Sequence, residues 1–531
     1  MRQIHFSAWL LVLLSAVLQV LIFPLAGVYV LCWVALTPLI VALLRARPIG
    51  ELQIQGVTRL QPATPWQGFV LGYVCGIIWY AGTCYWIYDT MHQYGGLSAP
   101  IGLLVLFLFC CYLGLYHGLF GLLVALVARP QDDRRALVLS PFLWVAVERA
   151  RTRVTGFPWN LLGIAQVDNV ALSRIAAWTG VYGISFEILL VNVALAAAFL
   201  VPRRKRSAML VAGIAAAVVL QAGRLVQPPP VTADRAALLV QQNIPVSADW
   251  SPGYYEQTLG DLTKLTLKEA ERNAAKKIDL IVWPESPAPF FTNEPNFRQA
   301  LSTMAREAKL PVVSGAIGTN APRVNSEGPL FNSAVLINAN GDWQARYDKA
   351  HLVPFGEYLP FPSLFSFAGG LTKEVGQFEH GNSRSPLDAA GEKLGVFICY
   401  ESIFPDEVRQ FAEDGAEVFV NISNDGWYGD SGAYAQHLNQ TRMRAVENDR
   451  WILSATDTGV TASIDPYGRV AARSPRKQRT ALVAPYSLTF VTTFYTRNGD
   501  WFAYLCAIIS LGALIASFTF PKRRAEVATS S

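Results

Sequence analysis

The chain has 531 residues, of which 52% are hydrophobic and 16% are charged, whereas soluble domains carry about 25% charged residues. The deficit of charge is concentrated in the first 225 residues, which excludes an ordinary soluble protein and indicates a membrane part joined to a soluble part. The net charge of +5 comes largely from short Arg and Lys clusters beside apolar stretches. Such clusters are typical of membrane topology signals, and we expect no nucleic-acid partner.

Eight apolar segments predict eight membrane-spanning helices, because a helix needs about 20 apolar residues to cross the hydrocarbon core. The segment Leu137–Val147 is short for a span. Leu97–Ala128 carries no charged residue over its length, so we expect it to be tilted or overlong. The first segment has no signal-peptide cleavage site and a second span follows at once, so we expect it to be retained. The eight segments are Trp9–Leu25, Val28–Leu44, Gly68–Tyr88, Leu97–Ala128, Leu137–Val147, Val170–Val201, Met209–Ala222 and Trp501–Phe520.

The basic residues predict how these spans are oriented. With the N-terminus inside, the inner side receives five basic clusters, which are Arg2, Arg45 with Arg47, Arg129 with Arg134 and Arg135, Arg203–Arg206, and Lys522–Arg524. One outer loop breaks the rule with Arg149, Arg151 and Arg153, for which we hypothesise contacts with lipid phosphates.

This orientation divides the chain into three parts. Residues 1–225 form a membrane domain with seven spans, residues 226–498 form an outer domain, and residues 499–531 form a last span with a basic cytoplasmic tail. In a bacterium the spans would lie in the inner membrane. The outer domain would lie in the periplasm, and both termini would be cytoplasmic.

Beyond the Pro-rich stretch Gln227–Pro230, strand patterns alternate with helical patterns, which predicts an α/β domain. Asn340-Gly341 indicates a hairpin turn within this domain. The expected strands are Ala236–Gln241, Leu280–Trp283, Val312–Ala316, Ala334–Ile337, Leu394–Cys399, Val418–Ile422 and Ile452–Ala455. The expected helices are Tyr254–Lys276, Phe297–Lys309, Pro405–Glu413 and Tyr434–Asp449.

Cys399 is the one cysteine of the seven that lies between residues 225 and 500. The outer domain therefore cannot hold an internal disulfide, and a lone thiol in an oxidising compartment needs another role. Cys399 ends an expected strand and is followed at once by Tyr400 and Glu401. A thiolate here would be a strong nucleophile. The ordinary alternative is a buried core residue, which is the common fate of a free cysteine.

Two further stretches carry groups that suit catalysis. In LIVWPE the carboxylate of Glu285 follows a strand beside Trp and Pro, where partial desolvation would suit it to general-base work. In YDKAH the amine of Lys349 would stabilise a thiolate and an oxyanion. The alternatives are a solvated glutamate, a surface lysine, or His351 as the base of a papain-like pair. Nothing local favours His380 or His437, and without CxxC or HExxH we predict no metal site.

The order of three motifs, Glu285 in WPE, Lys349 in YDKAHLVPFGEY and Cys399 in CYE, resembles the Glu-Lys-Cys triad of the nitrilase, or carbon–nitrogen hydrolase, superfamily. The apparent spans and the sequence motifs HLVPFGEY and SNDGW extend the resemblance to the whole chain. It resembles the apolipoprotein N-acyltransferase family of Gram-negative bacteria, which is a membrane-embedded branch of that superfamily. The resemblance implies a polytopic α-helical membrane domain plus a nitrilase-like α-β-β-α sandwich on the periplasmic face.

The resemblance also implies a reaction. A fatty acyl chain moves from the sn-1 position of a phospholipid, phosphatidylethanolamine in this family, to the N-terminal amine of a diacylglyceryl apolipoprotein. The reaction is ping-pong through a thioester on Cys399, with Glu285 as base and Lys349 as oxyanion donor. We expect a monomer without a cofactor. The substrate-binding and supporting residues carried over in the same way are Trp250, Asn332, Glu357, Tyr400 and Glu401.

Two other functions stay open from the residues alone. A membrane-anchored amidase would use the same triad with water as second substrate, although a tether needs only one span. A transporter or receptor with a periplasmic sensing domain would need several intramembrane charges, and the spans hold only Arg174 and Glu187 as exceptions. The aromatic segment Phe355–Phe367 is either core or a mobile arm that dips into the membrane interface, and we favour the arm.

Overall fold

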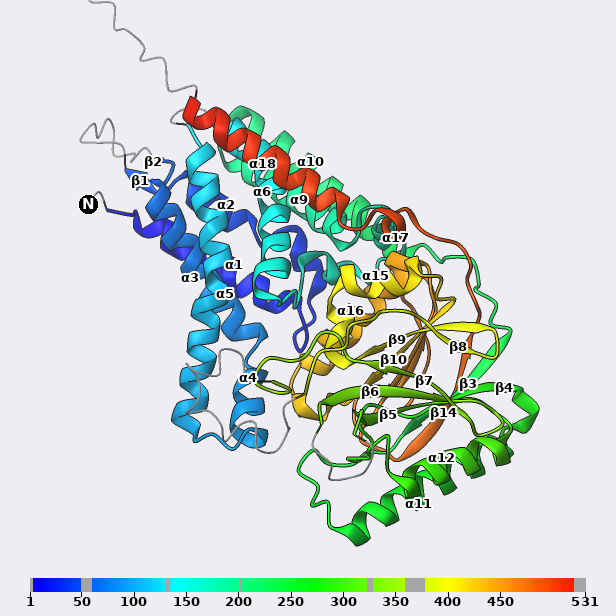
Figure 1. Cartoon of the computed structure of the whole chain (residues 1–531). Helices are drawn as coiled ribbons and strands as arrows, with labels where there is room; N and C mark the ends of the chain where they lie inside the picture. The colour runs from blue at the N-terminus through cyan, green and yellow to red at the C-terminus, as the bar shows by residue number, and fades with distance from the viewer. Residues whose placement is uncertain are drawn as a thin grey trace, which may run out of the picture.

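The computed structural model describes residues 3–48, 60–129, 133–200, 203–321, 328–358 and 378–519. Most helices gather in one part of the molecule, and two β-sheets with their covering helices form the other (Figure 1). Arg2, the tail cluster Lys522–Arg524 and most of the segment Phe355–Phe367 lie outside the described residues.

Each predicted apolar segment overlaps a helix. Among the described residues, four helices are long and apolar enough to cross a membrane. The number is five if the helix Pro65–Thr83 and the helix after it, bent by 56°, form one span. The predicted total of eight spans is not confirmed, because Phe6–Ile22 and Tyr29–Leu44 are shorter apolar helices. The helices are α1 (Phe6–Ile22), α2 (Thr37–Leu44), α3 (Pro65–Thr83), α4 (Trp86–Asp89), α5 (Ala99–Val127), α6 (Arg134–Ala150), α9 (Val181–Leu200), α10 (Arg203–Ala222) and α18 (Trp501–Thr519).

The predicted segment Val170–Val201 is broken into three pieces. The short helices α7 (Val170–Ser173) and α8 (Ala176–Thr179) precede α9. Gly180 ends α8 with a φ of +67°, and a β-carbon there would lie 2.6 Å from the ring of Tyr495. Only glycine fits both the left-handed backbone and the close ring. The break places α8 against the sheet-covering helix α16 (Ala433–Asn448).

Glycines allow α3 and α5 to pack at close range. A β-carbon on Gly72 would lie 2.2 Å from the carbonyl oxygen of His117, and one on Gly121 would lie 2.1 Å from that of Gly68. Small residues at such contacts let helix backbones approach one another in membranes. The predicted overlong span is one continuous helix of 29 residues, α5.

Two six-stranded sheets form the second part. Their strand orders are β14-β3-β4-β5-β6-β7 and β13-β12-β11-β10-β9-β8, with β3-β4-β5 and β9-β10-β11 parallel. All seven predicted strands are confirmed, as β3 to β6 and β9 to β11. The strands are β3 (Arg235–Gln241), β4 (Ile278–Val282), β5 (Val312–Thr319), β6 (Leu330–Ile337), β7 (Trp343–Asp348), β8 (Leu387–Ala389), β9 (Glu392–Ile398), β10 (Val418–Ser423), β11 (Ile452–Thr456), β12 (Ala462–Ile464), β13 (Val470–Arg473) and β14 (Thr480–Tyr486).

The sheets and their helices stack as α-β-β-α (Figure 1). The helices α11 (Pro252–Arg272) and α12 (Pro295–Ala308) cover the first sheet, and α15 (Pro405–Glu413) and α16 cover the second. Strand β3 shows why both faces of the first sheet are apolar. Its residues Leu238 and Val240 join the core beneath α11 and α12, whereas Ala237 and Leu239 join the core between the sheets.

The layer of α15 and α16 also rests on the helical part (Figure 1). Buried hydrogen bonds to residues of α16 cross the contact. Trp159 Nε1–H donates to Oε1 of Gln436 at 2.6 Å, and the N–H of Val181, at the start of α9, donates to Oε1 of Glu447 at 2.9 Å. The residues of the sheet part that join the core of the helical part include Tyr400, Ile403, Phe404, Met443 and Val446.

Candidate active site

Cys399 stands at the end of a buried strand in a strained turn. Strand β9 ends at Ile398, and Cys399 opens the 3₁₀ turn Cys399–Ile403 with a φ of +50°. A left-handed backbone costs a residue with a β-carbon roughly 1–2 kcal/mol. Such strain persists where the surroundings over-determine the conformation, and it gathers at functional sites. The turn sets Cys399 apart from an ordinary core cysteine.

Glu401 ties this turn to the end of β7. Its Oε2 accepts from the N–H of Ile398 at 2.7 Å. Its Oε1 accepts from the Tyr347 hydroxyl at 2.7 Å and from the N–H groups of Ala350 and His351 at 2.8 and 3.0 Å. These contacts give Glu401 a supporting part, because it joins the segment that bears the cysteine to the segment that bears the lysine.

Lys349 is buried between two carboxylates. Its Nζ lies 2.9 Å from Oε1 of Glu357 and 3.4 Å from Oε1 of Glu285, and its side chain is 1% exposed. Burial alone lowers the pKa of Lys349, but the charges of Glu357 and then Glu285 hold that pKa above its ordinary value. The amine therefore stays protonated, and the alternative of a surface lysine is wrong.

Glu285 follows β4 and is held by groups from three other segments. Its Oε1 accepts from Nδ2 of Asn332 at 2.7 Å, and its Oε2 accepts from the N–H of Asn424 at 2.9 Å. Asn332 Nδ2 also donates to Oε1 of Glu357 at 2.6 Å, so it bridges the two carboxylates. A β-carbon at Gly315 would lie 2.5 Å from the backbone beside Glu285, so β5 approaches this segment closely. The alternative of a solvated glutamate is wrong, because Glu285 is buried.

The charges of this cluster act on the thiol. Burial raises the pKa of Cys399 well above its usual value, the charge of Glu285 raises it further, and the charge of Lys349 lowers it. The thiol is therefore protonated at neutral pH and needs a base at the moment of attack. A buried carboxylate, a fixed ammonium and a strained thiol are together suited to nucleophilic attack on a carbonyl.

The other predicted residues have different surroundings. The Tyr400 hydroxyl donates to the carbonyl of Gly156 at 3.0 Å, which links the cysteine turn to the helical part. The ring of Trp250 lies 5.4 Å from that of Tyr254 and packs against the core beneath α11. Nδ1 of His351, the rival base, lies 2.8 Å from Oε1 of Glu407.

The three arginines of the predicted outer loop have partners within the protein. Arg149 pairs with Asp500 at 3.1 Å and Asp406 at 3.6 Å. Arg151 is buried and donates to the carbonyl of Trp159 at 2.8 Å. Arg153 is 63% exposed at its side chain and also reaches Asp406. The hypothesis of lipid phosphate contacts is therefore unsupported for Arg149 and Arg151.

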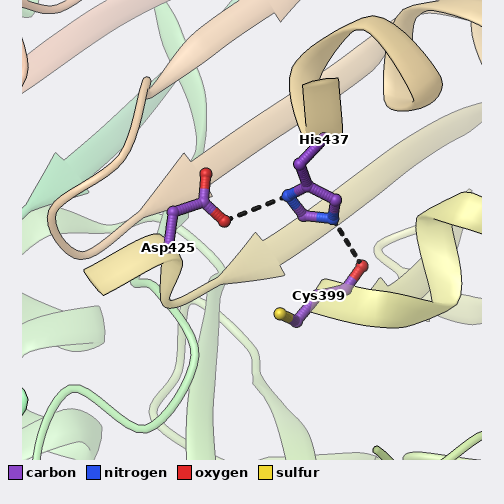
Figure 2. A group of neighbouring side chains, drawn as sticks. All are labelled: Cys399, Asp425 and His437. Atoms are coloured by element: carbon purple, nitrogen blue, oxygen red, sulfur yellow. Dashed lines mark hydrogen bonds and ion pairs between the residues drawn. The ribbon is translucent and has the colours of Figure 1, made fainter. Parts of the chain in front are cut away.

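Asp425 and His437 lie beside Cys399, as Figure 2 shows. His437 Nδ1 lies 3.0 Å from Oδ1 of Asp425, and its Nε2 lies 3.1 Å from the carbonyl oxygen of Cys399. Asp425 falls in the SNDGW phrase after β10, and the parallel pairing of β9 with β10 brings that phrase beside the cysteine. For His437, on α16, the sequence offered no local signal.

Comparison with known proteins places the whole chain. A protein of Geobacter metallireducens named apolipoprotein N-acyltransferase is 35% identical over 97% of this chain and 96% of its own. The chain belongs to the apolipoprotein N-acyltransferase family. A second protein of that name, from Methylococcus capsulatus, is 32% identical over 87% of this chain and 89% of its own. Residues 224–494 match the carbon-nitrogen hydrolase family, and residues 15–194 match the apolipoprotein N-acyltransferase N-terminal domain.

Membership of the apolipoprotein N-acyltransferase family makes the chain an acyltransferase of lipoprotein N-acylation with a nitrilase-like domain. It sets aside the alternatives of an anchored amidase and of a transporter or receptor. A crystal structure of a carbon-nitrogen hydrolase from Helicobacter pylori G27 is also similar, at 18% identity and a TM-score of 0.36 over 47% of this chain and 88% of that chain. That likeness is too distant to add to the fold described above.

Proposed function

We propose that the enzyme moves a fatty acyl chain from the sn-1 ester of a phospholipid to the N-terminal amine of a diacylglyceryl-cysteine lipoprotein, through a thioester on Cys399. The single observation that carries this proposal is the buried cluster in which Lys349 lies between Glu285 and Glu357. That cluster acts electrostatically on a protonated thiol held in a strained turn.

In the first half-reaction Glu285 takes the proton of the Cys399 thiol as its sulfur attacks the ester carbonyl. The carbonyl oxygen becomes an oxyanion, which Lys349 and the backbone N–H of Tyr400 bind. The carbon–oxygen bond then breaks, and the leaving alkoxide takes the proton from Glu285 to give a lysophospholipid. The acyl chain remains on Cys399 as a thioester. Loss of one oxyanion donor costs on the order of 10²–10³ in rate.

In the second half-reaction the lipoprotein amine attacks the thioester carbonyl and its proton passes to Glu285. The carbon–sulfur bond breaks, the sulfur takes the proton back, and an amide is formed. A thioester is an activated acyl group, so no ATP is needed. The thioester must resist water, which favours its placement beside an apolar part of the protein. The residues after Cys399 join the core of the helical part, which supports that placement.

We further propose phosphatidylethanolamine as the donor and a monomeric enzyme in the bacterial inner membrane. Residues 1–225 and 499–531 would form the membrane part, with both termini in the cytoplasm. Residues 226–498 would form the periplasmic catalytic domain. The basic clusters at the predicted inner loops support this orientation.

The deciding experiment measures the intact mass of the purified protein after exposure to phosphatidylethanolamine, for the unmodified enzyme and for Cys399→Ala. We expect an added fatty-acyl mass on the unmodified enzyme that hydroxylamine removes, and no added mass on the variant. A synthetic diacylglyceryl lipopeptide should then discharge the adduct and gain the acyl chain.

Two results would count against the proposal. An adduct that survives in Cys399→Ala would place the acyl group elsewhere. A thioester that water discharges as fast as the lipopeptide would point to hydrolysis as the reaction.

Glu285→Gln should form no thioester, and a normal yield in that variant would move the base to another residue.

A further inference from the structure

His437 touches the backbone of the nucleophile and not its sulfur. Its Nε2 lies 3.1 Å from the carbonyl oxygen of Cys399. In Figure 2 that carbonyl points toward the ring, whereas the sulfur points away from it. On its other side the ring meets Asp425, with Nδ1 3.0 Å from Oδ1. His437 can therefore act on the shape of the cysteine turn, while the thiol proton is left to another base.

The ring of His437 is fixed by its surroundings. His437 and Asp425 are 2% and 4% exposed. Oδ1 of Asp425 also accepts from the Ser423 hydroxyl at 2.7 Å, and the Ser402 hydroxyl oxygen lies 2.8 Å from Nε2 of His437. The indole of Trp159 lies 6.1 Å from the ring and is tilted from it by only 3°. A rotation of the ring would break several of these contacts at once.

Both ring nitrogens face oxygen atoms that accept hydrogen bonds. The carbonyl of Cys399 has no hydrogen to give, so Nε2 must donate to it, and Nδ1 donates to the carboxylate of Asp425. Burial alone lowers the pKa of His437, but the charge of Asp425 holds that pKa above its usual value. These two contacts and the charge of Asp425 together favour a ring that donates at both ends.

We propose that His437, held by Asp425, is a positioning residue that fixes the peptide unit between Cys399 and Tyr400. Its Nε2–H holds the carbonyl oxygen of that peptide unit. A peptide unit is planar and trans, so the N–H of Tyr400 then points the opposite way in a fixed direction. One contact thus sets both the left-handed turn that presents the thiol and the aim of a proposed oxyanion donor. The inference rests on the proposed thioester chemistry.

A metal ion is the competing occupant of this cluster. A ligand atom from each of Cys399, Asp425 and His437 lies within 4.8 Å of the others, which is a spacing that a metal could bridge. A metal, however, would need a ring nitrogen without a hydrogen. Both ring nitrogens already lie within hydrogen-bond distance of protein oxygens. The contacts therefore favour the positioning role, and metal binding becomes an outcome of the test.

The test compares four variants in the full-length enzyme. His437→Ala removes the contact, His437→Gln keeps an N–H that can reach the Cys399 carbonyl, and Asp425→Asn removes the charge that holds the ring. The matched control is His380→Ala, because His380 also contacts a backbone carbonyl, that of Ala350 at 3.1 Å, but is exposed. The readouts are kcat and KM for thioester formation from phosphatidylethanolamine, with and without EDTA or Zn²⁺.

We expect His437→Ala and Asp425→Asn to lower kcat on the order of 10²-fold, the cost of displacing a reacting group by about 1 Å. KM should stay unchanged, His437→Gln should recover part of kcat, and His380→Ala should behave as the unmodified enzyme. An unchanged kcat in His437→Ala, a loss confined to KM, or a His437→Gln no better than His437→Ala would overturn the proposal. Loss of activity in EDTA that Zn²⁺ restores would assign a metal instead.

Two safeguards keep the result clear. If His437→Ala is not recovered folded, Asp425→Asn and His437→Gln decide, and an unchanged kcat in Asp425→Asn overturns the proposal. A failure of the proposed thioester chemistry can be told apart from a failure of the His437 proposal. It would show as an acyl adduct on Cys399→Ala, whatever the His437 variants do.

Discussion

Lys349 Nζ lies 2.9 Å from Oε1 of Glu357, and the two side chains are 1% and 9% exposed. Glu357 is itself held, since its Oε1 accepts from Asn332 and its Oε2 accepts from the N–H of Val353 at 2.7 Å. Glu285 holds the lysine more loosely, at 3.4 Å. Of the two carboxylates, Glu357 is therefore the better anchor for the amine, and Glu285 is freer to accept a proton.

Glu357→Gln should slow thioester formation on the order of 10²-fold. Without the Glu357 charge, Lys349 would move toward Glu285 and compete with the thiol proton for that carboxylate. The rate is measured by intact mass over time after mixing with phospholipid. Glu379→Gln is the control, because Glu379 is exposed. Equal rates for the two variants would contradict the division of roles between the carboxylates.

Arg149→Met should lower the free energy of unfolding by about 3–5 kcal/mol, because it leaves Asp500 buried without its cation. The side chains of Arg149 and Asp500 are 6% and 1% exposed. Arg153→Met is the control, since Arg153 also pairs with Asp406 but is 63% exposed at its side chain, and it should cost less than about 1 kcal/mol. Thermal unfolding in detergent measures both. Similar shifts in Tm for the two variants would show that burial of the pair is not what matters.

Gly72→Ala should lower Tm, because the added carbon would lie 2.2 Å from the carbonyl oxygen of His117 on α5. Helices α3 and α5 would have to separate, because the atom in the way belongs to the backbone and cannot move aside as the end of a flexible side chain can. Gly512→Ala in α18 is the control, since nothing lies within 4 Å of its β-carbon position. That variant should be neutral or slightly stabilising through the higher helix propensity of alanine. A Gly72→Ala protein as stable as Gly512→Ala would mean that α3 and α5 are not closely packed.

Asp457 should make stability depend on pH. Burial raises its pKa to about 7, and the N–H groups of Ile244 and Asn243 oppose this only in part. An unfolded aspartate has a pKa of about 3.9. The protonated carboxyl therefore contributes stability that is fully present below about pH 4 and is lost as the pH rises through about 7.

Asp457→Asn should make Tm depend less on pH between about 4 and 7, since an amide does not titrate. The control is Asp249→Asn, whose carboxylate is exposed. A Tm profile for Asp457→Asn parallel to that of the unmodified enzyme would show that this carboxyl does not titrate in the folded protein.

The hydrophobic pattern of the sequence was enough to predict the strands that are buried on both faces. Strand β3 carries the apolar run Ala236–Val240, and β10 is buried along its whole length. Their predicted bounds agree with the structure within a residue or two. Strand β7, with the sequence WQARYD, and the short strand β8 are edge strands with polar or exposed positions. Their pairing depends on a neighbouring strand rather than on their own pattern, so the sequence did not predict them.

The candidate site was predictable only where a residue sits at a strand end within a motif. Glu285, Lys349 and Cys399 each do so, and the structure brings Glu285 and Lys349 into one ion pair. His437 lies on a helix and reaches the site because α16 packs against the turn Cys399–Ile403. The break at Gly180 was likewise missed, because one glycine within an apolar run says little until Tyr495 is placed against it.

The residues after Cys399 lie in the same apolar core as the membrane helices. The nucleophile therefore cannot move independently of those helices. On the proposed function, both substrates must come to it by diffusing within the plane of the bilayer. The relevant concentration is then two-dimensional. Diluting the donor phospholipid with an inert lipid, at constant amounts of enzyme and donor per volume, should slow acylation in proportion to the mole fraction of donor.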